Sequence, residues 1–363
     1  MVNLDDLGVY RRLDPANMLE HLHGLPQQCH TAWQKAKDFE LPRDYAKIDK
    51  VVILGMGGSA IGGDLLRNFI SRLTKPIVFV TRDYDLPAFV DERTLVIASS
   101  YSGNTEETLS AFSQALERKC KKLAMTTGGK LKALAQNAKV PVFIIDHIYQ
   151  PRAAIGYSFI PLIYILQRLK PEPTRIFDMF DREPDVQVEA MIQDLEKLLG
   201  ELKETIPTSS NPAKQLATKL QGKIAVIYGA GILSEVARRW KTQINENSKS
   251  WAFHETFPEL NHNAVVGYQF PAELASKLYV VLLRCPSLHP RTLIRYQVTC
   301  ELLEQNSISH QLIDSQGESE LSQMMSLIYL GDWVSYYLAI LYQTDPTPVK
   351  VIDYLKKRLS EAK

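Results

Sequence analysis

The stretch Val51-Val52-Ile53-Leu54-Gly55-Met56-Gly57-Gly58-Ser59 decides the fold. Its four consecutive apolar residues are typical of a strand that is buried on both faces in a parallel sheet. The glycines that follow let the chain turn sharply and let a ligand approach the backbone amides. A helix that starts here would offer unpaired N–H groups and a partial positive charge, so the stretch predicts a strand, a turn, a helix and an anion site.

Further short apolar runs follow this stretch, at 77–80, 95–98, 123–125 and 142–145. Each run is separated from the next by enough residues for a helix, and this alternation predicts a parallel sheet covered by helices on both faces. After Pro207 the pattern returns, because the run 224–227 leads into a second glycine turn, Gly229-Ala230-Gly231. Additional strand candidates lie at 251–253 and 278–283. The fold class is therefore α/β, with two tandem, doubly wound parallel-sheet domains.

The order of these signals divides the chain into five segments. Nearby prolines and few apolar residues, starting at Lys170-Pro171-Glu172-Pro173, indicate a linker between the two domains. We expect an N-terminal helical segment (1–45), a first domain (46–170), a linker and helix (171–206), a second domain (207–345) and a C-terminal helix (346–363).

Charge and cysteine usage exclude several classes of protein. The 363 residues include 42 Lys+Arg and 41 Asp+Glu, a net charge of +1, so neither a general nucleic-acid binder nor a polybasic membrane binder is expected. The four cysteines form no CxxC pair and no zinc-type cluster, so we expect no metal. The N-terminus has no apolar leader and no stretch has the roughly 20 uninterrupted apolar residues of a membrane span. These features predict a cytoplasmic protein.

A second polar constellation, Ser100-Tyr101-Ser102-Gly103-Asn104-Thr105, follows the run 95–98. Three hydroxyls in a glycine-containing turn before a helix suit a terminal phosphate dianion. A capped helix is the plain alternative, but a cap needs one hydroxyl and this turn has three. The first turn also nearly matches a dinucleotide fingerprint, Gly55-x-Gly57-x-x-Ala60 with Asp83, but such a fold does not need the hydroxyl cluster. The second glycine turn has no such cluster, so we expect one site per subunit.

The Gly-Gly-Ser turn and the Ser-Tyr-Ser-Gly-Asn-Thr loop resemble those of the sugar isomerase (SIS) domain family. Two such domains in tandem, together with Pro151-Arg152-Ala153-Ala154 and Glu259-Leu260-Asn261-His262-Asn263, resemble the bifunctional phosphoglucose/phosphomannose isomerases. The resemblance covers nearly the whole chain, from Leu13-Asp14-Pro15-Ala16-Asn17-Met18 to Asp345-Pro346-Thr347-Pro348-Val349. It implies that Gly58 and Ser59 form the substrate-binding turn. The phosphate loop would consist of Ser100, Ser102 and Thr105.

The resemblance also assigns the catalytic roles. It implies that Arg152 stabilises the enediolate, that Glu246 is the base and that His262 opens the sugar ring from the partner subunit. Lys356 matches the C-terminal lysine of the site, with the neighbouring Lys357 as the alternative. Without the resemblance, each side chain fits a solvated surface position, and Glu246 would be an ordinary residue at the end of a predicted helix over 234–247.

The resemblance therefore implies an aldose–ketose isomerase that needs no cofactor. We expect it to interconvert glucose 6-phosphate and fructose 6-phosphate, and mannose 6-phosphate and fructose 6-phosphate, through a cis-enediol and as a homodimer. A non-catalytic sugar-phosphate-binding regulator is the alternative from another class, but a regulator does not need Glu246, His262 and Lys356. A nicotinamide-dependent oxidoreductase and an amino-sugar phosphate isomerase are further alternatives.

Overall fold

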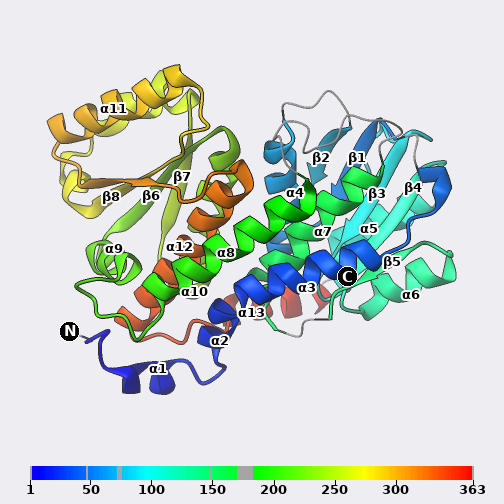
Figure 1. The fold of residues 1–363 in the computed structure, drawn as a ribbon, viewed down its shortest axis with the longest axis horizontal. Helices are drawn as coiled ribbons and strands as arrows, with labels where there is room; N and C mark the ends of the chain where they lie inside the picture. Colours follow the sequence, from blue (N-terminus) through cyan, green and yellow to red (C-terminus); the bar gives the residue numbers. More distant parts are fainter. Residues whose placement is uncertain (1, 46–47, 72–75, 147–148, 170–182, 362–363) are drawn as a thin grey trace. The chain divides into compact units, whose positions relative to one another are not determined.

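A computed structural model describes residues 2–45, 48–71, 76–146, 149–169 and 183–361 (Figure 1). Contacts divide the chain into two compact units. The N-sheet unit comprises residues 24–196 and 317–325, and the C-sheet unit comprises residues 1–23, 197–316 and 326–363. Most of the predicted linker, residues 171–182, lies outside the described residues.

The sheet of the N-sheet unit is fully parallel, with the strand order β2-β1-β3-β4-β5. Its strands are β1 (Lys50–Leu54), β2 (Ile77–Thr81), β3 (Thr94–Ser99), β4 (Lys121–Thr126) and β5 (Val142–Ile144). The helices are α3 (Leu25–Asp38), α4 (Gly57–Phe69), α5 (Glu106–Leu116), α6 (Gly129–Asn137) and α7 (Ile155–Arg168), with the 3-10 helices η1 (Arg43–Tyr45) and η2 (Pro151–Ala153). The apolar runs of the sequence are thus the strands of a parallel sheet.

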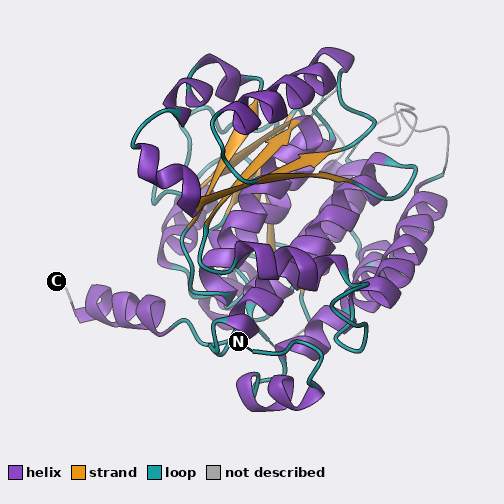
Figure 2. Ribbon diagram, turned by 90° about the vertical axis from the view of Figure 1, so that its left-hand side faces the viewer, coloured by secondary structure: helices purple, strands orange, loops and turns teal. Residues whose placement is uncertain are grey.

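The side chains of β1 alternate between two helical layers. Val52 and Leu54 belong to a buried cluster that includes residues of α5 and α6. On the opposite face, α4 lies so close to the sheet that a Cβ on Gly63 would be 2.9 Å from Ile53 Cδ1. A strand that is buried on both faces cannot alternate apolar with polar residues, which explains the uninterrupted run in the sequence. The predicted doubly wound sheet is confirmed, because α5 and α6 pack on one face of β1 and α4 on the other. Figure 2 shows helices on both sides of the strands nearest the viewer, which belong to the C-sheet unit.

The C-sheet unit repeats this arrangement. Its strands are also parallel, in the order β7-β6-β8-β9, which corresponds to β2-β1-β3-β4 of the first sheet. The glycine turns correspond as well, because Gly57 has a φ of +50° and Gly231 a φ of +51°. The strands are β6 (Ile224–Ala230), β7 (Ala252–Phe257), β8 (Leu278–Arg284) and β9 (His310–Asp314). This correspondence confirms the predicted tandem of two α/β domains.

The helices of the C-sheet unit complete the fold. They are α1 (Leu7–Leu13), α2 (Met18–His23), α9 (Pro212–Leu220), α10 (Ser234–Asn247), α11 (Pro290–Gln305) and α13 (Lys350–Glu361), with the 3-10 helices η4 (Gly231–Leu233), η5 (Glu259–His262), η6 (Ala264–Tyr268) and η7 (Ala272–Lys277). Two longer helices, α8 (Pro184–Leu202) and α12 (Glu320–Leu341), contain the boundaries between the units. The C-terminal helix, expected from residue 346, begins at Lys350.

The helix α12 is apolar on all sides. By length and composition it could cross a membrane, and in the part of the chain that the structure describes it is the one helix of that kind. The apolar stretch of this helix is, however, fully buried within the molecule, as is typical of a core helix.

Candidate active site

The two polar constellations of the sequence meet at one edge of the first sheet. Strands β1 and β3 are hydrogen-bonded neighbours, and their chains continue into α4 and α5 on opposite faces. The carboxyl ends of two such strands form the topological switch point of a doubly wound sheet, where ligands bind. The glycine turn 55–59 follows β1 and the loop 100–105 follows β3, so both lie at this switch point.

Direct hydrogen bonds join the turn to the loop. The Ser59 hydroxyl accepts a hydrogen bond from the backbone N–H of Tyr101 at 3.0 Å, and the Ser99 hydroxyl donates to the Ser59 carbonyl at 2.9 Å. A Cβ on Gly55 would be 2.9 Å from the Ser99 carbonyl oxygen, so only glycine allows this approach. The predicted substrate-binding turn and phosphate loop are therefore in direct contact.

The hydroxyls of the loop are not used to cap the helix that follows. Thr105 is the N-cap residue of α5 but makes no side-chain cap hydrogen bond. Its hydroxyl instead lies 2.9 Å from the hydroxyl of the buried Ser100. Ser102 is exposed and its hydroxyl accepts a hydrogen bond from the Asn104 N–H at 3.2 Å. The Thr105 hydroxyl therefore does not cap α5, and the phosphate loop itself stays a prediction.

A third loop supports the phosphate loop from the end of β4. Gly103 has a φ of +68°, and its carbonyl accepts a hydrogen bond from the Leu131 N–H at 2.9 Å. A Cβ on Gly103 would overlap the Gly128 carbonyl oxygen. A Cβ on Gly129 would likewise overlap the Ser102 carbonyl oxygen. Two positions at this contact, Gly103 and Gly129, have a positive φ, so the chain geometry requires glycine there.

Arg152 lies beside the glycine turn. Arg152 belongs to the 3-10 helix η2 and is only 3% exposed. Its guanidinium donates a hydrogen bond to Gln150 Oε1 at 3.2 Å. A Cβ on Gly58 would be 2.9 Å from the Pro151 carbonyl oxygen and 3.1 Å from the Arg152 nitrogen. The N-sheet unit therefore brings together Arg152 and the five predicted binding residues. The backbone of Arg152 thus lies next to the glycine turn, and a guanidinium there can pair with an anion.

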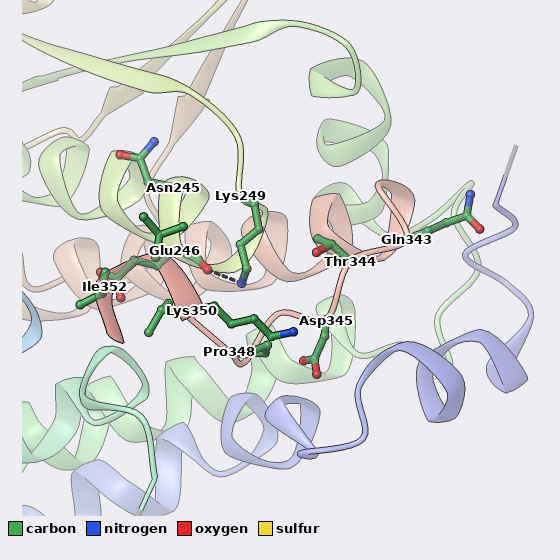
Figure 3. Close-up of a pocket in the computed structure, with 11 residues that line it drawn as sticks. Asn245, Glu246, Lys249, Gln343, Thr344, Asp345, Pro348, Lys350 and Ile352 are labelled. Atoms are coloured by element: carbon green, nitrogen blue, oxygen red, sulfur yellow. Dashed lines mark hydrogen bonds between the residues drawn. The ribbon is translucent and has the colours of Figure 1, made fainter. Parts of the chain in front are cut away.

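Glu246 lies in the C-sheet unit, in the last turn of α10, whose bounds match the predicted helix. Its partly buried side chain lines a pocket of about 670 Å³ (Figure 3). Lys249, Asp345 and Lys350 line the same pocket, together with apolar residues at the start of α13. Sequence patterns do not single out Lys249, which is an isolated lysine, or Lys350, which belongs to a basic stretch with Lys356 and Lys357.

The end of α10 is fixed to α12 by buried polar contacts. Asn247 Nδ2 donates to the Ser335 hydroxyl at 2.9 Å, and the Ser248 hydroxyl donates to the Ser335 carbonyl at 2.7 Å. Lys249 Nζ donates to the Glu246 carbonyl at 2.6 Å and to the Pro346 carbonyl at 3.0 Å. The backbone of Glu246 is thus held in place by the contacts of Asn247, Ser248 and Lys249, so the position from which its side chain extends is fixed.

The other two predicted catalytic residues lie on the surface of the C-sheet unit. His262 ends η5 and is exposed, and Lys356 is exposed in the middle of α13, as is Lys357. None of the three lines the pocket that contains Glu246. The fold of this unit alone therefore does not bring them to Glu246.

The second glycine turn is covered by an apolar side chain. A Cβ on Gly231 would be 3.2 Å from Leu288 Cδ2, and Leu288 is only 8% exposed. Leu288 belongs to the loop after β8, which takes the place of the phosphate loop after β3. In that loop His289 caps α11 by accepting from the Arg291 N–H. The second switch point thus lacks the hydroxyl cluster of the first, as the sequence indicated.

Metal ligands do not gather anywhere in the described ranges. No group of three or more His, Cys, Asp or Glu side chains among those residues could hold a metal ion. The cysteines, Cys29, Cys120, Cys285 and Cys300, are all free thiols.

Family comparisons agree with the fold of both units. The SIS domain family model matches residues 44–155, and the bacterial phospho-glucose isomerase C-terminal SIS domain model matches residues 209–359. A glucose-6-phosphate isomerase like protein from Thermus thermophilus has the same fold, with a TM-score of 0.65 at 18% identity over 97% of this chain and 100% of that chain. The two family models and the two parallel sheets thus define a protein with two sugar isomerase (SIS) domains.

Closer relatives identify the family. A bifunctional phosphoglucose/phosphomannose isomerase from Caldicellulosiruptor bescii is 47% identical over 95% of this chain and 100% of that protein. Another from Aquifex aeolicus is 35% identical over 89% of this chain and 94% of its own. The chain belongs to the bifunctional phosphoglucose/phosphomannose isomerase family, which confirms the resemblance inferred from the sequence.

Proposed function

We propose that this protein interconverts glucose 6-phosphate and fructose 6-phosphate, and mannose 6-phosphate and fructose 6-phosphate, without a metal or cofactor. The observation that carries the proposal is the Ser100–Thr105 hydroxyl pair, which lies at the switch point and is not used as a helix cap. Its loop is hydrogen-bonded to the glycine turn, and Gly58 of that turn lies against the backbone of Arg152. The names of the relatives supply the substrates. We place the enzyme in the cytoplasm, as its sequence predicts.

The phosphate loop binds the part of the substrate that does not react. Hydroxyls of Ser100, Ser102 and Thr105 donate to the phosphate oxygens, and the N-terminus of α5 adds unpaired N–H groups. Gly58 and Ser59 place their backbone against the sugar. The binding energy of the phosphate positions the reacting carbons, C1 and C2.

The isomerisation needs a base and a cation. Glu246 takes the proton from C2 of the aldose, and the electrons of that bond form the enediolate as the C1 carbonyl oxygen becomes negative. Arg152 stabilises this charge while a proton passes from the C2 hydroxyl to the C1 oxygen. The same carboxylate then returns its proton to C1 as the C2 carbonyl forms, which gives the ketose. Both aldoses share this enediol because they differ only in configuration at C2. The proposal requires Glu246 and the phosphate loop to act on one sugar.

Ring opening precedes proton transfer. We assign it to His262 and Lys356, because imidazole and ammonium groups can move protons between the ring oxygen and the anomeric hydroxyl. The surface position of His262 in its own unit supports a role for this histidine in a partner subunit, and hence a homodimer.

Turnover of the two aldoses tests the function directly. Purified protein in EDTA is expected to form fructose 6-phosphate from glucose 6-phosphate and, separately, from mannose 6-phosphate. Tight sugar-phosphate binding without turnover of either aldose would instead favour the non-catalytic regulator. Activity that depends on an added nicotinamide cofactor would favour the oxidoreductase.

Replacing Ser102 by alanine is expected to raise KM roughly tenfold with little change in kcat, since it removes one hydrogen bond to a charged phosphate. Steady-state kinetics with both aldoses measure the effect. Ser113→Ala is the matched control, because this serine lies on α5 outside the phosphate loop and its hydroxyl donates to the Leu109 carbonyl of the same helix. An unchanged KM in Ser102→Ala would place the phosphate elsewhere.

Mixed dimers test whether His262 acts in the partner subunit. Glu246→Gln and His262→Ala are each expected to be nearly inactive, but their heterodimer has one site with both native residues. Subunits mixed, dissociated and reassociated should therefore recover about a quarter of wild-type activity. No recovery, with heterodimers demonstrated by mass spectrometry, would show that His262 serves its own subunit.

A further inference from the structure

We propose that Tyr101 is a positioning residue that links the phosphate loop to the turn that carries Arg152. The link is the hydrogen bond that the phenol oxygen of Tyr101 accepts from the backbone N–H of Tyr149. The inference rests on the proposed function, because it concerns how Arg152 is kept in place for enediolate stabilisation. Tyr101 acts through Arg152 and does not itself touch the substrate.

The backbone of Tyr101 joins three loops of the N-sheet unit. Its N–H donates to the Ser59 hydroxyl at 3.0 Å, in the turn after β1. Its carbonyl accepts from the Thr127 N–H at 3.0 Å and from the Thr127 hydroxyl at 2.8 Å, in the loop after β4. Its neighbours in sequence are Ser100 and Ser102 of the phosphate loop. The position of Tyr101 is therefore set by the same contacts that shape the phosphate loop.

The side chain of Tyr101 reaches a fourth segment. Its phenol oxygen accepts a hydrogen bond from the backbone N–H of Tyr149 at 2.8 Å, and Tyr149 lies three residues before Arg152. Tyr101 is half-buried, and this burial raises the pKa of its phenol, so the group stays neutral across the working pH range. Phenylalanine would keep the ring and lose only the hydroxyl, which accepts the hydrogen bond from Tyr149.

Two other contacts hold the arginine turn. The Gln28 side chain, on α3, donates to the Ala153 carbonyl at 2.9 Å and accepts from the Gly156 N–H at 2.7 Å. Gly58 lies against Pro151 with no room for a side chain. Gln28 thus holds the residues that follow Arg152, and Gly58 packs against the residue that precedes it. The Tyr101 phenol holds the segment just before the turn, at Tyr149.

The position of Arg152 matters for catalysis. An enediolate is stabilised only by a cation that is held in place before charge develops, and a misplacement of about 1 Å can cost a factor of about 10² in rate. Because Tyr101 contacts both loops, the arginine turn is held in register with the bound phosphate. Loss of the phenol oxygen should therefore lower kcat more than it raises KM.

Hydrogen exchange tests the contact without reference to activity. In Tyr101→Phe, the amide of Tyr149 is expected to exchange roughly tenfold faster, because it loses its acceptor. Tyr84→Phe is the matched control, since Tyr84 is an exposed tyrosine of the same unit. Peptides that cover residues 149–153 report the change, and an unchanged exchange rate in Tyr101→Phe would overturn the proposal.

A double-mutant cycle tests the role. Tyr101→Phe alone is expected to lower kcat roughly tenfold with KM changed less than about threefold, and Tyr84→Phe to leave both unchanged. In an Arg152→Ala background the same Tyr101 change should lower kcat by less than about twofold, because the group through which it acts is gone. A full tenfold loss in both backgrounds, or no loss in either, would overturn the proposal.

The outcomes separate this inference from the proposed function. If the wild-type protein turns over neither aldose, the proposed function fails and the inference fails with it. If the wild type is active but the effects of Tyr101→Phe and Arg152→Ala are additive, only the inference fails. A melting temperature close to the wild-type value in Tyr101→Phe checks that the kinetic change is not a loss of folded protein.

Discussion

Replacing Glu246 by glutamine is expected to lower kcat by about 10³-fold for both aldoses, while the affinity for sugar phosphate stays within about twofold of wild type. The amide has nearly the shape of the carboxylate but cannot accept a proton. The local backbone should not move, because Asn247, Ser248 and Lys249 hold it through contacts that do not use the Glu246 side chain. Phosphate binding depends on other residues, so it should persist.

Two measurements on the same preparation check this expectation. Steady-state turnover gives kcat, and isothermal titration with fructose 6-phosphate gives the affinity of the inactive variant. Glu301→Gln is the matched control, as it removes an exposed carboxylate from α11 of the same unit and should leave both quantities unchanged. Turnover of Glu246→Gln at more than about a tenth of the wild-type rate would mean that another group is the base.

Replacing Gly103 by alanine is expected to lower the free energy of unfolding by about 2–4 kcal/mol and to raise KM at least about tenfold. The φ of +68° is unfavourable for any side chain, and the new Cβ would overlap the Gly128 carbonyl. Relief of that overlap must move the loop that carries Ser102, so phosphate binding is lost together with stability.

Chemical denaturation and steady-state kinetics check the Gly103 prediction. Gly200→Ala is the control, since Gly200 lies in α8 with no atom within 4 Å of the position that a Cβ would take, and alanine there should stabilise the helix by about 0.5–1 kcal/mol. A Gly103→Ala protein with wild-type stability and KM would show that the phosphate loop is not held in the way that the structure indicates.

The fold and the first switch point could be predicted because their signals are local. A β-branched run, a glycine turn and a hydroxyl-rich loop are each short and continuous in the sequence, so each can be recognised without knowledge of the rest of the chain. The repeat of the glycine turn at Gly229 then predicted the second sheet. The structure places Gly58, Ser59 and the phosphate-loop hydroxyls together because neighbouring parallel strands end at the same edge.

Other features depend on contacts between distant residues, which sequence patterns do not encode. The strand β9 was not predicted, because His310–Asp314 contains only two strongly apolar residues and is only partly buried at the edge of its sheet. The core helix α12 was not predicted either, since a helix that is apolar on all sides has no amphipathic period. The contact between Tyr101 and Tyr149 spans 48 residues and appears only in the folded chain.

Isomerisation of fructose 6-phosphate in D2O is the most direct test of the central claim, that one enediol formed by a protein base serves both aldoses. On prolonged incubation the enzyme is expected to produce glucose 6-phosphate and mannose 6-phosphate that both carry deuterium at C2, as measured by NMR, because the proton on the carboxylate exchanges with solvent. Aldoses without deuterium at C2 would indicate a hydride shift and contradict the account. The formation of neither aldose would contradict it entirely.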